Sequence, residues 1–312
     1  MSTRTSKLDW LFGVDEAPVY ATVTHKGVVR ELRLPHKKAL VAGDTGEVVG
    51  IVGSGYKVFT NQEAVELGFR FCHEAFPDTK PAEWTFVEGH GPRKRSWVAM
   101  DIHHQAHAMN LMGSRGKISE LYTPFVRITN SYNGTRAVRL DVGFLRKHCD
   151  NGMIFEEEAA TLRVPHTRRG ILSLQLVKPF EGMTALREEF GKALAGIQAQ
   201  GLSREEGLRL VQEVTGWPTL PEQPRPWERA EQERLDADLA SRLERYFGEL
   251  GENAYAAFNT MTDIASHPPK SSRFRRDRPT LERRAGVWLR EFRREGGGSG
   301  GRVARQVVGA VG

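Results

Sequence analysis

Short stretches of alternating apolar and polar residues, bounded by turn formers, fill the first half of the chain. The segment 17–34, "APVYATVTHKGVVRELRL", alternates around His25-Lys26-Gly27. The segment 37–53, "KKALVAGDTGEVVGIVG", places β-branched residues on both sides of Asp44-Thr45-Gly46. Two further strand-like runs, "WTFVEG" and "RSWVAMDI", flank the turn-rich "HGPRK". This patterning predicts antiparallel strands joined by tight turns.

A helix is predicted between these strands, over residues 61–76. Thr60 or Asn61 can cap its N-terminus, and Glu63 supplies a carboxylate to its first turn. Apolar residues recur at spacings of four, three and four, which gives one buried face. Those residues are Val65, Phe69, Cys72 and Phe76. Pro77 is expected to end the helix.

The stretch 125–146 carries the strongest hairpin signal in the chain, Asn133-Gly134. A two-residue loop would oppose apolar and charged residues, so a three-residue loop, 133–135, is predicted instead. The register that follows pairs Ile128 with Leu140, Val126 with Val142, Arg127 with Asp141, and Thr129 with Arg139. In this register the arginines face solvent.

The second half of the chain has helical periodicity. One stripe consists of Met183, Leu186, Phe190, Leu194 and Ile197, and another of Leu235, Leu239, Leu243 and Phe247. A further helix is predicted over 279–295, whereas residues 103–122 show no period and are expected to form a loop. The predicted fold is α+β: an antiparallel sheet of hairpins packed on a helix, followed by a helical half. Its predicted divisions are a β-rich part, a helical region, and a basic helix with linker and tail, at 1–177, 178–268 and 269–312.

Composition limits the cellular locations that are expected for the protein. No apolar run approaches the roughly 20 residues of a membrane span, and the start of the chain lacks the apolar stretch of a signal peptide. The two cysteines, Cys72 and Cys149, are too few for a disulfide framework or, alone, a zinc site. A cytoplasmic protein is the expectation.

Charge is distributed unevenly along the chain. Residues 268–306 contain twelve Lys/Arg and four Asp/Glu, a local net charge of +8, although the whole chain carries only +6. Such asymmetry favours an anionic partner such as nucleic acid, and a solvated basic tail is the alternative. Basic turns interleaved with aromatic residues recur in the β-rich half, as single-strand binding requires. The predicted nucleic-acid-binding residues are Arg93, Lys94, Arg95, Arg127, Arg136, Arg139, Arg146, Lys147, Arg168, Arg169, Tyr56, Lys57, Tyr132, Arg273, Arg275 and Arg276.

Signals for enzyme chemistry are weak. On a helix, His103 and His107 of "HHQAH" would share a face at the spacing that zinc enzymes use, but the glutamate of the HExxH motif is absent. His148 and Cys149 are adjacent, so on a strand they point to opposite sides and make no catalytic pair. The glycines of "VGSGYK" match no phosphate-binding loop. We therefore predict no catalytic residues, no metal site and no cofactor.

A set of motifs resembles a known family. "KALVAGDTGEVVGIVGSGYKVFTNQEAVE", "VRITNSYNGTRAVRL", "LRKHCDNGM", "VPHT" and "NAYAAFNTMTDIASHP" occur in the order seen in phage- and plasmid-encoded proteins that carry domain of unknown function 932. The resemblance spans about residues 17–268. It implies a mobile-element context and no established activity, so it assigns no site residues.

The order of elements is also similar, more weakly, to that of Rad52-type single-strand annealing proteins, which assemble into rings and bind DNA through basic groove residues. Together with the basic hairpins, this similarity implies a non-enzymatic protein that binds single-stranded DNA and forms a homo-oligomer. Annealing or protection of DNA in recombination or replication is the expected role. A protein–protein interaction module, and a metal-dependent enzyme centred on His103, His104 and His107, are the alternatives.

Overall fold

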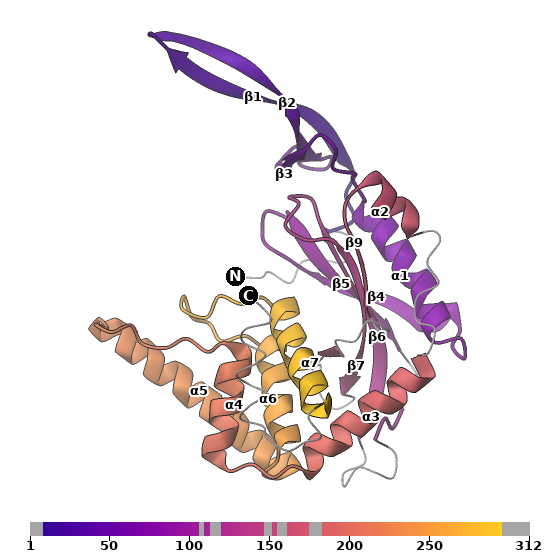
Figure 1. The fold of residues 1–312 in the computed structure, drawn as a ribbon, viewed down its shortest axis with the longest axis vertical. Coiled ribbons are helices and arrows are strands. Elements are labelled where there is room, and N and C mark those ends of the chain that lie inside the picture. Colours follow the sequence, from indigo (N-terminus) through magenta and orange to yellow (C-terminus); the bar gives the residue numbers. More distant parts are fainter. Residues whose placement is uncertain are drawn as a thin grey trace. The chain divides into compact units, whose positions relative to one another are not determined.

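The structure is a computed structural model that describes residues 9–105, 109–112, 120–146, 152–154, 161–174 and 183–294. Antiparallel sheets occupy its N-terminal half and helices its C-terminal half, which confirms the α+β fold (Figure 1). The chain divides into two compact units, each assembled from separated segments. The first comprises 1–106, 125–142 and 161–181, and the second comprises 107–124, 143–160 and 182–312. The sequence-based division into consecutive segments differs from this, because β6 and β7 contribute residues to both units.

A three-stranded antiparallel sheet opens the first unit, in the order β1 (Val14–His25), β2 (Val28–Ala42) and β3 (Val48–Gly53). Between β1 and β2, Lys26 and Gly27 both adopt positive φ, +50° and +77°. This is the conformation that two-residue hairpin turns need, so the predicted turn is confirmed. β1 and β2 together form a long two-stranded hairpin, indigo in Figure 1.

Helix α1 (Asn61–Ala75) follows β3 and begins where the sequence predicts. The Thr60 hydroxyl accepts a hydrogen bond from the Glu63 N–H, and the Glu63 carboxylate accepts one from the Thr60 N–H. This reciprocal pair is a capping box, which satisfies two otherwise unpaired donors. Of the two caps that the sequence allows, Thr60 and Asn61, the structure shows Thr60 as the cap.

A six-stranded antiparallel sheet follows α1. Its order is β4-β5-β6-β7-β8, and β9 also pairs with β7. The strands and two short helices that complete this region are β4 (Trp84–His90), β5 (Trp97–His104), β6 (Tyr122–Ser131), β7 (Val138–Arg146), β8 (Gly152–Ile154), β9 (Thr161–Val164), η1 (Pro81–Glu83) and α2 (Arg168–Ser173). α1 packs closely on one face of this sheet (Figure 1). A Cβ on Gly68 would lie 2.2 Å from Ile128 Cδ1, so any larger residue there requires the Ile128 side chain to move.

Two expectations about this sheet are wrong. β5 continues to His104, so the predicted loop from residue 103 begins inside a strand. The connection between β6 and β7 spans residues 132–137 rather than the predicted 133–135. The Ser131 hydroxyl donates to the Arg136 carbonyl and accepts from its N–H, and the Asn133 side chain accepts from the Thr135 N–H. These side-chain bonds satisfy backbone groups within the connection.

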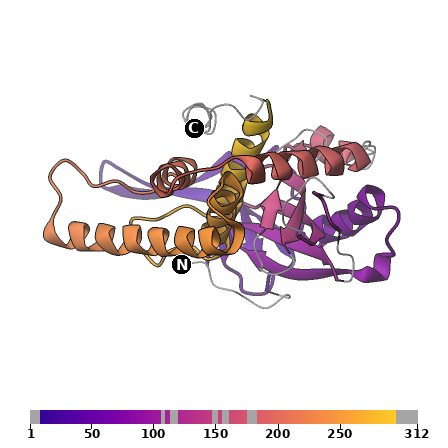
Figure 2. The ribbon, with the colours of Figure 1, turned by 90° about the horizontal axis from the view of Figure 1, so that it is seen from below.

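The second unit is mainly helical. Its helices are α3 (Met183–Ala199), α4 (Arg204–Thr215), α5 (Pro226–Leu250), α6 (Ala254–Ser266) and α7 (Arg278–Arg294). α6 is buried from Ala254 to Ala265 and packs against each of the other four helices. Figure 2 shows α5, in orange, as one unbroken helix. None of the helices in the described ranges combines the length and apolar character that a membrane span requires.

Candidate nucleic-acid interface

Arg127 does not lie on a solvent-exposed face, contrary to the prediction. It donates two hydrogen bonds, of 2.7 and 2.6 Å, to the Asp101 carboxylate on β5, and the two side chains are 1% and 0% exposed. The predicted outward-facing position is thus wrong: Arg127 forms a buried bidentate ion pair across β5 and β6, and the charge of Asp141 also acts on its guanidinium. A guanidinium in this position stabilises a buried charge and is not accessible to phosphate.

Two other hairpin arginines are also held in ion pairs, Arg139 half-buried and Arg146 buried. Arg139 donates to both oxygens of Asp141 at 2.8 Å, and its side chain is 12% exposed. Arg146 donates to both oxygens of Glu120 at 2.7 and 2.8 Å, with both side chains under 10% exposed. The hairpin arginines therefore bind carboxylates of the chain itself, and the expectation that they face solvent is wrong.

Arg95 and Tyr132 have structural contacts as well. Arg95 donates to both oxygens of Asp44, which lowers the pKa of that carboxyl group, and its guanidinium lies 4.1 Å from the Phe12 ring centroid. The Tyr132 ring belongs to the core of the three-stranded sheet, and its hydroxyl accepts from the Asn61 N–H. Tyr132 was predicted to stack on bases, but it is only 1% exposed.

Other predicted residues, far apart in the sequence, come together. The Lys57 N–H donates to the His166 carbonyl at 2.9 Å, and a His166 ring nitrogen lies 3.2 Å from the Lys57 carbonyl. The rings of Tyr56 and His166 stack with centroids 4.5 Å apart and an interplanar angle of 13°. Burial lowers the pKa of His166, which favours a neutral imidazole in this stack. Loop 53–60 is therefore held beside the start of α2.

The β6–β7 connection joins the same group of loops. The Tyr56 hydroxyl donates to the Ser131 carbonyl at 2.5 Å, and burial raises the Tyr56 pKa to about 12. A Cβ on Gly134 would lie 3.8 Å from the Tyr56 ring. Arg136, from the same connection, is half-buried, with its guanidinium 3.8 Å from the Trp97 ring centroid. Tyr56 thus ties three loops to one another.

We call these segments, the loops 53–60 and 131–137 together with residues 165–174, which include the short helix α2, the three-loop patch. They contain four Lys/Arg residues and no Asp or Glu. Three of the four cations are exposed and form no ion pair with any residue in the described ranges, namely Lys57, Arg168 and Arg169. Cations without a partner carboxylate are available to an external anion.

The remaining predicted basic residues lie elsewhere. Arg93 and Lys94 are exposed at the β4–β5 turn. Arg273 is half-buried, donating to the Thr219 and Glu228 carbonyls, whereas Arg275 and Arg276 are exposed. Within α7 the basic residues largely serve the fold. Arg278 pairs with the buried Glu282, and Arg284 donates to the Val214 and Glu213 carbonyls at the C-terminal end of α4. Much of the charge counted in the basic segment is therefore already neutralised or bonded.

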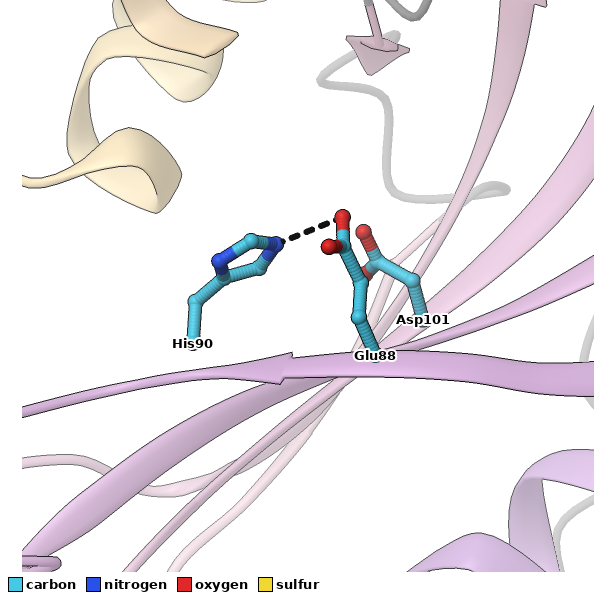
Figure 3. Close-up of side chains that lie close together, drawn as sticks. All are labelled: Glu88, His90 and Asp101. Carbon is cyan, nitrogen blue, oxygen red and sulfur yellow. Dashed lines mark ion pairs between the residues drawn. The ribbon is translucent and has the colours of Figure 1, made fainter. Parts of the chain in front are cut away.

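A polar cluster that the sequence did not reveal lies on β4 and β5. Glu88 and His90 lie two residues apart on β4, and Glu88 is opposite Asp101 on β5 (Figure 3). Their ligand atoms lie within 4.8 Å of one another, as a divalent cation would need. However, Glu88 pairs with His90 at 2.8 Å, and both Asp101 oxygens already accept from Arg127. A cation here would compete with a guanidinium, so we interpret the cluster as a buried ion-pair network.

The sequence contains the spacing of Glu88 and His90, but it does not identify the third member of this cluster. Glu88 and His90 alternate on a strand and therefore share a face, but their partner depends on the β4–β5 register, which contains a bulge after Phe86. His103 and His104, by contrast, are consecutive strand residues and point to opposite faces, so the helical spacing on which the metal alternative relied does not exist there. Lys147, His107, His148 and Cys149 lie outside the described residues.

One protein family matches the chain. It is described as "Domain of unknown function (DUF932)", and the match covers residues 48–288. It starts later than the resemblance seen in the sequence and extends twenty residues further, into α7. No curated protein and no solved structure matches the chain. Because the match covers well over half of its length, the chain belongs to the family of domain of unknown function 932.

Proposed function

We propose that this protein binds single-stranded nucleic acid through the three-loop patch. The observation that supports the proposal is the convergence of Lys57, Arg168 and Arg169 on loops that contain no carboxylate. Phosphate groups are the anions most often recognised by such exposed cations, and these contacts carry affinity without reading sequence.

Rigidity of the patch supports the same proposal. The Tyr56–His166 stack, the two contacts between His166 and Lys57, and the Tyr56–Ser131 hydrogen bond connect the loops before any ligand arrives. A pre-formed arrangement reduces the entropy lost on binding. Half-buried Tyr56 precedes Lys57 in the chain, and of the two predicted stacking residues it is the one that remains a candidate for base contact, since Tyr132 is buried.

The salt dependence of binding tests the proposal. Labelled single-stranded DNA is titrated by fluorescence anisotropy at several salt concentrations, with the triple variant Lys57→Ala/Arg168→Ala/Arg169→Ala beside the wild type. Each lost phosphate contact on a single strand lowers the log–log salt slope by about 0.7, so the triple variant should lower it by about 2.

A matched control removes the same charge from another surface. Arg209, Arg229 and Arg234 are exposed on the helical unit, and their triple alanine variant should keep most of the wild-type slope. Equal effects of the two triple variants would mean that only net charge matters. Binding to single strands that is undetectable or independent of salt would refute the proposed function. If binding is observed, a strand-annealing assay distinguishes a protein that anneals strands from one that only binds them.

A further inference from the structure

The hairpin formed by β1 and β2 extends well beyond its own core. We call its outer part, residues 20–33, the arm; its paired residues run from Tyr20 opposite Arg33 to His25 opposite Val28. Every β2 residue from Val28 to Lys37 is exposed. Of the eleven large apolar side chains exposed in the described ranges, eight lie in β1–β3. A two-stranded hairpin alone is marginally stable in water, so this arm is suited to a partner.

The two faces of the arm differ. Directly opposed residues share a face, which places Ala21, Val23, Val28 and Leu32 together, with Arg30 opposite Val23 and His25 opposite Val28 on the same face. Three of the apolar side chains are 40–52% exposed. The opposite face carries more polar residues, with Thr22 opposite Glu31 among its pairs.

The two edges of the arm also differ. The β2 edge carries Arg30, Glu31, Arg33 and Pro35, which are the kinds of residue that protect an edge from pairing. β1 is the end strand of its sheet, and its residues 19–24 read Val-Tyr-Ala-Thr-Val-Thr. This run has strong β propensity and contains no charge, proline or glycine. An edge of that composition is a template for an added strand.

We propose that the arm pairs with the arm of a second copy of this chain, β1 against β1 in antiparallel orientation. The result is a continuous four-stranded ribbon with a two-fold axis near Ala21. Such pairing is isologous, and the uncharged run 19–24 brings no like charges together across the axis. Three or more strands with a shared apolar face supply the stability that one hairpin lacks.

Charge at the two ends of β1 fits this pairing. With Ala21 opposite Ala21, Lys26 at the tip of one arm is nearest to Glu16 at the root of the other, beyond the irregularity of β1 between Pro18 and Tyr20. Glu16 is 51% exposed and pairs with Lys38 of its own chain at 2.6 Å, so Lys26 would join an existing ion pair. The same register keeps odd-numbered residues on one face, so the apolar faces of both copies join. A nucleic acid fits this edge less well, because no cation lies along residues 19–24.

The experiment measures particle mass in a dilution series, without nucleic acid, so its outcome is independent of the proposed function. Ala21→Lys places two lysines opposite one another at the axis, and Ala21→Glu does the same with two carboxylates. Each variant alone should weaken dimerisation at least about tenfold. An equimolar mixture of the two should form mixed dimers, because the opposed charges then attract.

The matched control is Leu32→Lys, which adds the same charge to the same face, in the same cross-strand pair. Its two copies would lie about 14 Å apart, three strand spacings, and should leave the mass unchanged. A wild-type chain that is monomeric throughout the series would overturn the proposal. So would a dimer that Ala21→Lys leaves intact, a Leu32→Lys variant that dissociates equally, or a mixture that does not restore dimers.

Discussion

At the scale of single residues, the arginines separate into two classes that look identical in the sequence. Arg127, Arg139 and Arg146 are held in ion pairs with carboxylates, whereas Arg168 and Arg169 are exposed. Arginine is mostly exposed in proteins, so pattern alone favours solvent for all five. The partner of Arg127, Asp101, lies 26 residues earlier in the chain, and only strand pairing brings the two together.

Replacing Arg127 tests its structural role. Arg127→Ala leaves the Asp101 carboxylate buried without its bidentate partner, so the free energy of unfolding should fall by about 3–5 kcal/mol. Urea denaturation followed by circular dichroism measures the change. Arg93→Ala, at an exposed turn, is the control and should stay within about 0.5 kcal/mol of the wild type. A stable Arg127→Ala variant with weakened DNA binding would instead support the original expectation for this residue.

At the scale of elements, the predicted and observed structures agree best where the prediction depends on neighbouring residues in the sequence. The N-terminal cap of α1 and the His25-Lys26-Gly27 turn each depend on a few neighbouring residues: Thr60, one of the two predicted caps, forms the cap, and the turn forms as predicted. The β6–β7 connection was predicted too short, although Asn133-Gly134 was read correctly as its turn. Ser131 and Asn133 bond to backbone within the loop, and the Ser131 carbonyl accepts from Tyr56, 75 residues away in the sequence. That connection is therefore held partly by a tertiary contact.

Two glycines of β3 test how closely its sheet approaches this loop. A Cβ on Gly50 would lie 2.0 Å from the Tyr132 carbonyl oxygen, whereas a Cβ on Gly53 would meet nothing within 4 Å. Gly50→Ala should therefore destabilise the protein by about 1–3 kcal/mol, because backbone must shift to admit the methyl group. Thermal melts compare it with Gly53→Ala, which should not lower the Tm. Similar melting of both variants would contradict the close approach.

At the scale of the whole molecule, the structure changes the interpretation of the basic segment 268–306. Its net charge suggested a surface for nucleic acid, but α7 is amphipathic and buries Leu281, Trp288, Leu289 and Phe292. It packs against α6 in the second unit, and the family match extends into it. Charge counted along a chain does not distinguish cations that bind a ligand from cations that bond to the protein itself.

Two tryptophans test whether α7 is part of the core of its unit. Trp288 is fully buried and stacks with Phe258 at 6.1 Å between ring centroids, so Trp288→Ala should cost about 3–5 kcal/mol. Trp227 is 52% exposed at the start of α5, and Trp227→Ala should have little effect. Denaturant titration gives both values. Equal and small losses would show that α7 is not needed for the stability of its unit.

The sequence by itself determined most of the strands of the first half, helix α1, the β1–β2 turn and the α+β class, because hydrophobic period and turn chemistry act over a few residues. It also placed Tyr56, Lys57, Arg168 and Arg169 among the candidates. Tertiary structure alone decided which cations remain available, and it brought loop 53–60 to His166 and buried Arg127 against Asp101. Those outcomes depend on register and on contacts between distant segments, since a cation is buried or exposed according to what the fold places beside it.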